Sequence, residues 1–177
     1  MPSSVEELVE ESIHDEFVEK FTAAVLAHAE GIAPLSSVAA AERLQEQVDR
    51  AVAQGASLVT SGERQGAFFP TGVLTGVTPD NDVYREELFG PIATVFKASS
   101  EEDAVTIAND TPFGLGSYVF TTDAEQATRV ADGIDAGMVV LYQRRSGLWK
   151  RMQAAPISRA KRTAAAARRG CRVAVAT

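Results

Sequence analysis

The sequence holds little of the chemistry that small catalytic or metal-binding domains use. Its 177 residues include one cysteine and two histidines. A single cysteine excludes an internal disulfide framework and fits a reducing compartment, so we expect a cytoplasmic protein. His14 and His28 lie far apart in the sequence, without cysteines or carboxylates at ligand spacing. The sequence therefore predicts no metal site.

Long apolar runs and phosphate-binding motifs are also absent. No apolar stretch approaches the ~20 residues that cross a bilayer. The acidic first residues lack the apolar segment of a signal peptide. We therefore expect no membrane partner. No G-x-G-x-x-G motif follows a strand pattern, and Gly114–Gly116 is too short to hold a phosphate.

A nucleophile with a neighbouring base is missing too. Cys171 lies between Gly170 and Arg172, and no base is placed to activate it. The serines lack any His–Asp context. From these residues alone, we predict no catalytic residue in this chain.

Acidic residues are absent from the last part of the chain. Residues 1–142 hold all 24 acidic residues and seven basic ones, a net charge of −17, whereas residues 143–177 hold ten basic residues and no acid. Such asymmetry often marks a tail for nucleic acid or membrane. However, Trp149 is the only aromatic residue among these arginines and no known nucleic-acid module is visible, so we do not expect a nucleic-acid partner.

The first 140 residues carry the periodic patterns of a folded domain. Apolar residues recur at helical spacing after Ser12 and from Val38, where Leu44, Val48 and Val52 share one face. Ser12 with Asp15, Ser100 with Asp103 and Thr122 with Glu125 are predicted capping pairs that start helices. We expect helices at residues 12–28 and 38–54 and after residues 100 and 122, and strands at 56–60, 68–77, 92–96, 116–120 and 137–140.

The order of these elements predicts the fold class. From residue 92 to residue 140 the pattern is strand, helix, strand, helix, strand, which favours parallel pairing with crossover helices. We therefore expect an α/β fold with a mainly parallel sheet flanked by helices.

The segment Glu86–Pro91 joins two carboxylates to an aromatic ring and a Gly-Pro pair. Gly90 frees the backbone and Pro91 restricts it, so the segment is a shaped turn. Two interpretations are open: a solvated acidic loop before a core strand, or one wall of a binding site. The local residues alone favour the loop.

Several stretches together resemble the aldehyde dehydrogenase superfamily. Residues 86–91 match its E-E-[IVL]-F-G-P motif, and residues 108–116 match A-N-x-[ST]-x-[YF]-G-L followed by a strand. Residues 9–21 resemble the helix that follows the family's nucleophilic cysteine, residues 66–71 resemble its approach to the central strands, and residues 137–139 match a G-x-V strand. Residues 68–70 and 82–87 are most similar to succinate-semialdehyde dehydrogenases.

The resemblance implies roles for two residues. In the family, the carboxylate at the position of Glu87 accepts hydrogen bonds from the nicotinamide ribose hydroxyls, and the ring at the position of Phe89 packs near the nicotinamide. It implies NAD or NADP as cofactor and oxidation of an aldehyde, with succinate semialdehyde as a candidate, to the acid. It also implies a homo-oligomer in the parent family. Asn109 and Gly114 are expected to shape a loop.

The departures from the family imply a fragment. The family's cysteine, its glutamate base, its oxyanion-hole asparagine and its nucleotide-binding domain all precede the stretch that this chain resembles. We therefore expect residues 1–142 to be a partial catalytic domain that is inactive alone. Residues 143–177 are expected to be an aberrant basic tail, disordered or read from a shifted frame, with Pro156–Thr163 as a faint echo of the family's glycine-rich segment. The alternative is a non-catalytic remnant or subunit-interaction fragment whose basic tail binds anionic partners.

Overall fold

The computed structural model describes residues 5–145, 148–151 and 171–175, with side chains described for residues 5–142. The chain divides into two units. One consists mainly of residues 15–96, and the other of residues 6–14 and 97–177. The tail segment Pro156–Thr163, for which we expect a faint echo of a family motif, lies outside the described residues.

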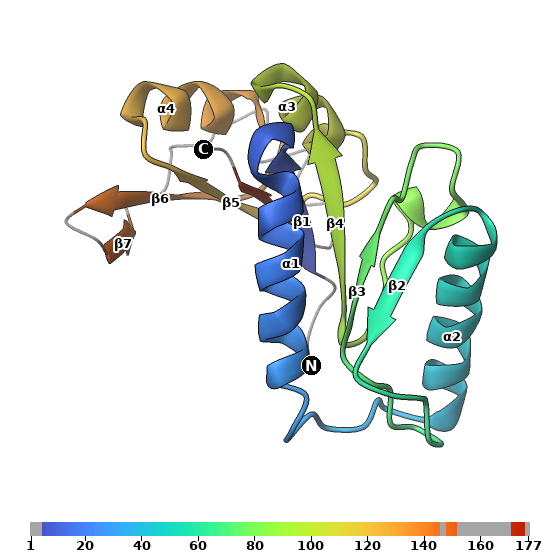
Figure 1. Ribbon diagram of the computed structural model, residues 1–177. Coiled ribbons are helices and arrows are strands. Elements are labelled where there is room, and N and C mark those ends of the chain that lie inside the picture. Colours follow the sequence, from blue (N-terminus) through green and yellow to red (C-terminus); the bar gives the residue numbers. More distant parts are fainter. Residues whose placement is uncertain (1–4, 146–147, 152–170, 176–177) are drawn as a thin grey trace. The chain divides into compact units, whose positions relative to one another are not determined.

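The first unit places strands beside a long amphipathic helix. In Figure 1, α2 runs alongside β2 and β3. Strands β2 and β3 are antiparallel, with Leu58 opposite Leu74, and β3 and β4 are parallel, with Val73 opposite Ala93. The elements that belong wholly or mainly to this unit are α1 (Glu11–Ala27), α2 (Val38–Ala53), β2 (Ser57–Thr60), β3 (Gly72–Thr75), the 3-10 helix η1 (Asp82–Arg85) and β4 (Ile92–Ala98).

Helix α2 has a clear sequence basis. The Ser37 hydroxyl accepts a hydrogen bond from Ala40 N at 3.1 Å and caps the first turn. Gly55, at φ +100°, follows the last turn, as its sequence position predicts. Ala41, Leu44, Val48 and Ala51 are buried. The prediction that Val52 shares this face is wrong, because the 3.6-residue period turns Val52 outward and brings Ala51 inward.

The second unit is built on a mostly parallel sheet of strand order β1-β8-β5-β6-β7. All neighbouring pairs are parallel except β6 and β7. Helix α4 packs on β5 and β6, while α3 packs on β8 and beside α4 (Figure 1). The elements are β1 (Val5–Glu10), α3 (Glu101–Asn109), β5 (Gly116–Thr121), α4 (Ala124–Gly133), β6 (Val139–Arg145), β7 (Leu148–Arg151) and β8 (Cys171–Val175).

Two of the three predicted capping pairs are wrong. Ser12 lies inside α1, and the Glu10 carboxylate instead accepts hydrogen bonds from the Ser12 amide, at 3.2 Å, and hydroxyl. Helix α4 is capped by Asp123, whose carboxylate accepts from Glu125 N at 2.8 Å and Gln126 N at 3.2 Å, and not by Thr122. The pair at Ser100 is confirmed, since its hydroxyl accepts from Asp103 N at 3.1 Å.

Strands β1, β7 and β8 have no counterpart among the predicted strands. Strand β1 carries Glu6 and Glu7, which are 6% and 9% exposed, and an acidic pair is a poor sequence signal for a buried strand. Strand β8 comes from the basic residues 143–177 and lies between β1 and β5. The predicted fold class is confirmed, because the sheets are mainly parallel and carry helices. No helix in the described part of the chain is long and apolar enough to cross a membrane.

Candidate functional site

The loop between η1 and β4 carries the segment Glu86–Pro91. Tyr84, in η1 just before the loop, is buried, and its ring lies edge-on to the Phe96 ring with 5.6 Å between the ring centroids. Leu88 in its middle is buried as well. A loop held by apolar contacts on both sides presents its remaining side chains in fixed directions.

Gly90 lets the loop pack closely on α2. A Cβ atom at this position would lie 2.3 Å from Cδ2 of Leu44, a buried residue of α2. The backbone of Gly90 does not adopt a positive φ. The expectation that Gly90 frees the backbone is therefore wrong in its reason, because the glycine allows close packing of the loop on α2.

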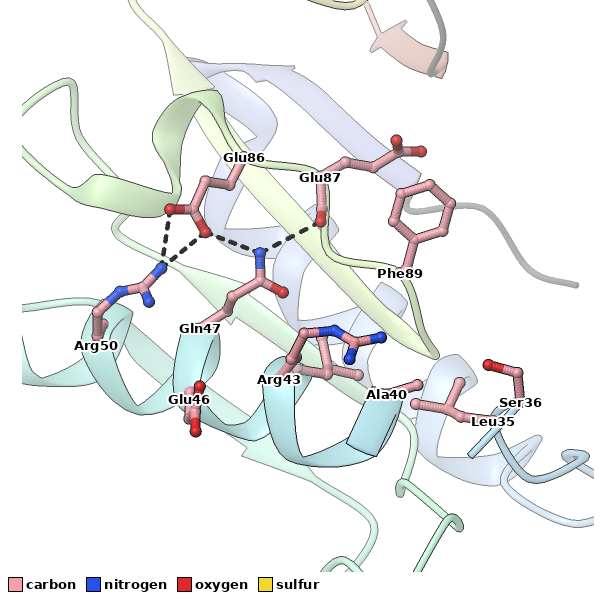
Figure 2. A pocket seen from close by; sticks show the side chains of 11 residues that line it. Leu35, Ser36, Ala40, Arg43, Glu46, Gln47, Arg50, Glu86, Glu87 and Phe89 are labelled. Carbon is pink, nitrogen blue, oxygen red and sulfur yellow. Dashed lines mark hydrogen bonds and ion pairs between the residues drawn. The ribbon is translucent and has the colours of Figure 1, made fainter. Parts of the chain in front are cut away.

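The two glutamates of the segment point in opposite directions (Figure 2). The Glu86 carboxylate turns to α2, where Arg50 Nη2 donates to both of its oxygens at 2.8 Å. Gln47 Nε2 donates to the same carboxylate at 2.8 Å and to the Glu87 carbonyl oxygen at 3.4 Å. Glu87 extends away from α2, on the side of the loop where the Phe89 ring lies.

Glu87 and Phe89 line one cavity of about 680 Å³ between the loop and α2. The Phe89 side chain is 64% exposed, whereas large aromatic rings in folded proteins are mostly buried. The structure thus brings the two sequence-predicted site residues together. The cavity is within the range of volumes that small-molecule sites occupy.

Helix α2 supplies the opposite wall of this cavity, which sequence reasoning missed. Arg43, Gln47 and Arg50 line it from α2, and Figure 2 shows Arg43 across from Phe89. The sequence does contain a signal for this wall, since these residues recur every three or four positions and so share one helix face. It was ambiguous because a polar row on a helix also fits a solvated surface.

The arrangement can bind a polar ligand that carries an aromatic ring. A carboxylate accepts hydrogen bonds from vicinal hydroxyls, an exposed ring offers a stacking surface, and arginine attracts an anionic group. The residues that line the cavity include one hydroxyl, Ser36, and neither cysteine nor histidine. Among the described residues, the lining thus offers groups that can bind and orient a ligand, and no thiol or imidazole. Across the described residues, no group of three or more His, Cys, Asp or Glu is arranged to hold a metal ion.

The second family-like stretch, Asn109–Gly116, lies in the other unit and has a structural role. Asn109 Nδ2 donates to the Gly133 carbonyl oxygen at 2.9 Å, and Asn109 Oδ1 accepts from Asp135 N at 2.7 Å. Gly137 N donates to the Gly114 carbonyl oxygen at 2.8 Å. These bonds join the end of α3 to the segment after α4, which agrees with the expected loop-shaping role.

Comparison with known protein families shows to which family this chain belongs. Residues 4–155 match the family described as the aldehyde dehydrogenase family. The chain belongs to this family. The match includes the Glu86–Pro91 loop and both walls of the cavity, and it extends past residue 142, the predicted end of the partial catalytic domain.

Individual aldehyde dehydrogenases agree with this placement. The NADP(+) succinate-semialdehyde dehydrogenase of Deinococcus radiodurans is 43% identical over 143 residues, which cover 75% of this chain and 30% of that enzyme. The NAD(P)+ succinate semialdehyde dehydrogenase of Escherichia coli is 37% identical over 145 residues. The chain thus spans about a third of the length of the relatives it matches.

Solved structures show the same partial overlap. The succinate-semialdehyde dehydrogenase of Burkholderia pseudomallei superposes with a TM-score of 0.71 at 38% identity, covering 80% of this chain and 31% of that one. The succinic semialdehyde dehydrogenase of Streptococcus pyogenes, solved in complex with NADP+, superposes with a TM-score of 0.72 at 29% identity, covering 84% and 36%. The aldehyde dehydrogenase fold therefore accounts for most of this chain.

Proposed function

We propose that the cavity beside Glu87 and Phe89 is the nicotinamide-ribose part of an NAD(P) site. The parent activity is oxidation of an aldehyde to its acid, with succinate semialdehyde as the leading substrate. The observation that carries the proposal is that Glu87, Phe89 and Arg43 line one cavity in a chain that belongs to the aldehyde dehydrogenase family. The names of the relatives, which include NADP(+) and succinate semialdehyde, support the cofactor and the substrate.

The chemistry of the lining fits this ligand. Glu87 accepts hydrogen bonds from the two ribose hydroxyls, and a charged acceptor makes these bonds stronger than neutral ones. Phe89 limits the movement of the ring that lies against it, which favours a reactive orientation. The bound cofactor supplies the hydride acceptor for the aldehyde.

We propose that this chain alone does not turn over an aldehyde. The cavity lining includes no thiol that would attack the carbonyl carbon and no histidine beside a hydroxyl. In this account residues 1–142 are part of a catalytic domain and residues 143–177 are an aberrant basic tail. Translation of the other two reading frames beyond codon 140 tests the tail's origin, because a shifted frame must yield the family's glycine-rich segment, which reads Pro-Phe-Gly-Gly.

A turnover assay tests the proposed function. The purified chain is incubated with NADP+ and succinate semialdehyde, alone and with an N-terminal fragment of a relative that carries the catalytic cysteine. We expect no NADPH from the chain alone and NADPH formation on mixing. Turnover by the chain alone would contradict this account.

The second candidate function is a non-catalytic fragment that binds anionic partners through its tail. Residues 143–177 contain ten basic residues and no acidic residue, and this positive charge favours the second candidate. A salt-sensitive mobility shift with a nucleic acid, in a chain that does not bind NADPH, would support this candidate over the first. For either function we propose a cytoplasmic location, since the single cysteine fits a reducing compartment. Assembly into a homo-oligomer is a further proposal.

A further inference from the structure

One row of side chains on α2 holds the segment that carries the candidate site. Gln47, Arg50 and Gln54 are three and four residues apart, so they line up along one face of the helix. Gln54 Oε1 accepts a hydrogen bond from Asp82 N at 2.8 Å, and Arg50 Nε lies 3.7 Å from Asp82 Oδ2. The same row therefore holds the start of η1 at Asp82 and, through the bonds to Glu86, the start of the segment Glu86–Pro91.

The row also contacts the backbone of the proposed cofactor residue. The Gln47 amide donates both to the Glu86 carboxylate and to the Glu87 carbonyl oxygen. Arg50 holds the other side of the Glu86 carboxylate with a second pair of bonds. With Glu86 held by α2 from two directions, the next side chain in the loop leaves on the opposite side, as Figure 2 shows for Glu87.

The helix that carries this row is itself fixed. The neighbouring row of α2, formed by Leu44, Val48 and Ala51, is buried in the core. Asn81 Nδ2 donates to the Ala51 carbonyl oxygen at 3.0 Å, and this bond is buried. A rigid element that presents three polar contacts to one loop is well suited to set the direction of that loop.

We propose that Gln47, Arg50 and Gln54 are positioning residues that set the direction of the Glu87 carboxylate and the Phe89 ring for a nicotinamide nucleotide. The inference rests on the proposed function, because it assigns the row a role in that same site. Glu86 is the anchor of the loop and Glu87 is its ligand-binding group. Loss of the row leaves Glu87 and Phe89 present but less well ordered, which weakens nucleotide binding.

The test uses the full chain and two independent measurements. The variant combines Gln47→Ala with Arg50→Gln. The matched control is Gln45→Ala, because the Gln45 amide donates to Asp49 on the same helix and not to the loop. Amide hydrogen exchange of residues 86–90 is measured without ligand, and NADPH affinity is measured by fluorescence titration. Arg50→Lys serves as the conservative variant, since lysine keeps the charge but lacks the second guanidinium nitrogen, Nε, that lies 3.7 Å from Asp82 Oδ2.

We expect the double variant to exchange residues 86–90 roughly three- to tenfold faster and to bind NADPH roughly three- to tenfold more weakly than the wild type. The exchange rate and the NADPH affinity of Arg50→Lys should lie between those of the double variant and those of the wild type. Gln45→Ala should match the wild type in both measurements. Unchanged exchange in the double variant overturns the inference. Faster exchange with unchanged NADPH affinity also overturns it, because the row then has no role in binding. A wild-type chain that binds no NADPH overturns the proposed function together with this inference. This outcome is distinguishable from failure of the inference alone, because the hydrogen-exchange measurement needs no ligand and still reports whether the row orders the loop.

Discussion

At the scale of single residues, the role that the structure gives Gly90 differs from the role that its sequence context predicts. Its sequence context favours a backbone role, but its backbone does not need glycine. A side chain at this position would displace the Leu44 methyl group, which lies 2.3 Å from where a Cβ would be. Only packing between residues distant in sequence reveals this constraint.

Substitution of Gly90 by alanine therefore tests the packing of the loop on α2. We expect Gly90→Ala to lower the free energy of unfolding by about 1–3 kcal/mol, because the new methyl overlaps Leu44. Gly62→Ala is the matched control, since a Cβ there meets no atom within 4 Å and Gly62 does not have a positive φ. Urea unfolding measures both variants. Equal stabilities for the two would show that Leu44 moves aside at no cost.

Glu7 gives a second prediction at this scale. Burial in β1 raises the pKa of its carboxyl from 4.5 to about 7, through desolvation of the charged form. The folded chain therefore holds a proton that the unfolded chain has released between pH 4.5 and 7. Stability should fall as pH rises through this window, by about 3 kcal/mol in total, and level off above it.

The substitution Glu7→Gln isolates this contribution, since it removes the titrating group and keeps its shape. Urea unfolding between pH 5 and pH 8 should show a flatter pH dependence for Glu7→Gln than for the wild type, with the variant more stable at pH 8. Glu102→Gln, on the exposed side of α3, should leave the slope as it is. A wild-type chain as stable at pH 8 as at pH 5 would argue against a buried neutral Glu7.

At the scale of elements, local signals predict helices better than they predict this sheet. The predicted helices at residues 12–28 and 38–54 agree with α1 and α2 to within one residue at each end. Strand β1 escapes prediction because it carries Glu6 and Glu7, and β8 because it is only five residues long and follows a basic stretch. They pair with each other over more than 150 residues of sequence, and no local rule reports such a contact.

The cap of α2 provides the prediction for this scale. Ser37→Ala removes the hydroxyl that accepts from Ala40 N and should cost about 1 kcal/mol of stability. Ser36→Ala, one residue earlier, changes the same group outside the capping position and should cost much less. Thermal unfolding of the two variants makes the comparison. A larger loss for Ser36→Ala would mean that the helix starts one residue earlier.

For the candidate site, one wall of the cavity can be predicted from the sequence, and the other is seen only in the structure. Glu87 and Phe89 follow from a motif of six consecutive residues, and the structure places both on the same cavity. Arg43 and Gln47 come from a helix about 40 residues earlier, and their polar row fits solvent as well as a ligand. Their place at the site depends on how α2 packs against the loop, which a one-dimensional pattern does not contain.

At the scale of the whole molecule, the chain is a family member that spans about a third of its relatives. The described lining of the cavity offers groups that can bind and orient a ligand, and no thiol. In our account, the chain provides the cofactor wall of a dehydrogenase, and the nucleophile has to come from elsewhere. Strands β7 and β8, which lie after residue 142, pair with β6 and β5 in the sheet of the second unit.

The central claim is that Glu87 and Phe89 contact the nicotinamide ribose, and saturation-transfer-difference NMR of NADP+ with the full chain tests it most directly. For the wild type we predict the strongest transfer at the nicotinamide and nicotinamide-ribose protons. Glu87→Gln should weaken binding about tenfold and reduce this transfer, because a charged acceptor of two hydroxyls is lost. Glu42→Gln, an exposed glutamate on α2 outside the cavity, should behave as the wild type. Transfer confined to the adenine protons, or equal signals from the wild type and Glu87→Gln, would contradict the account.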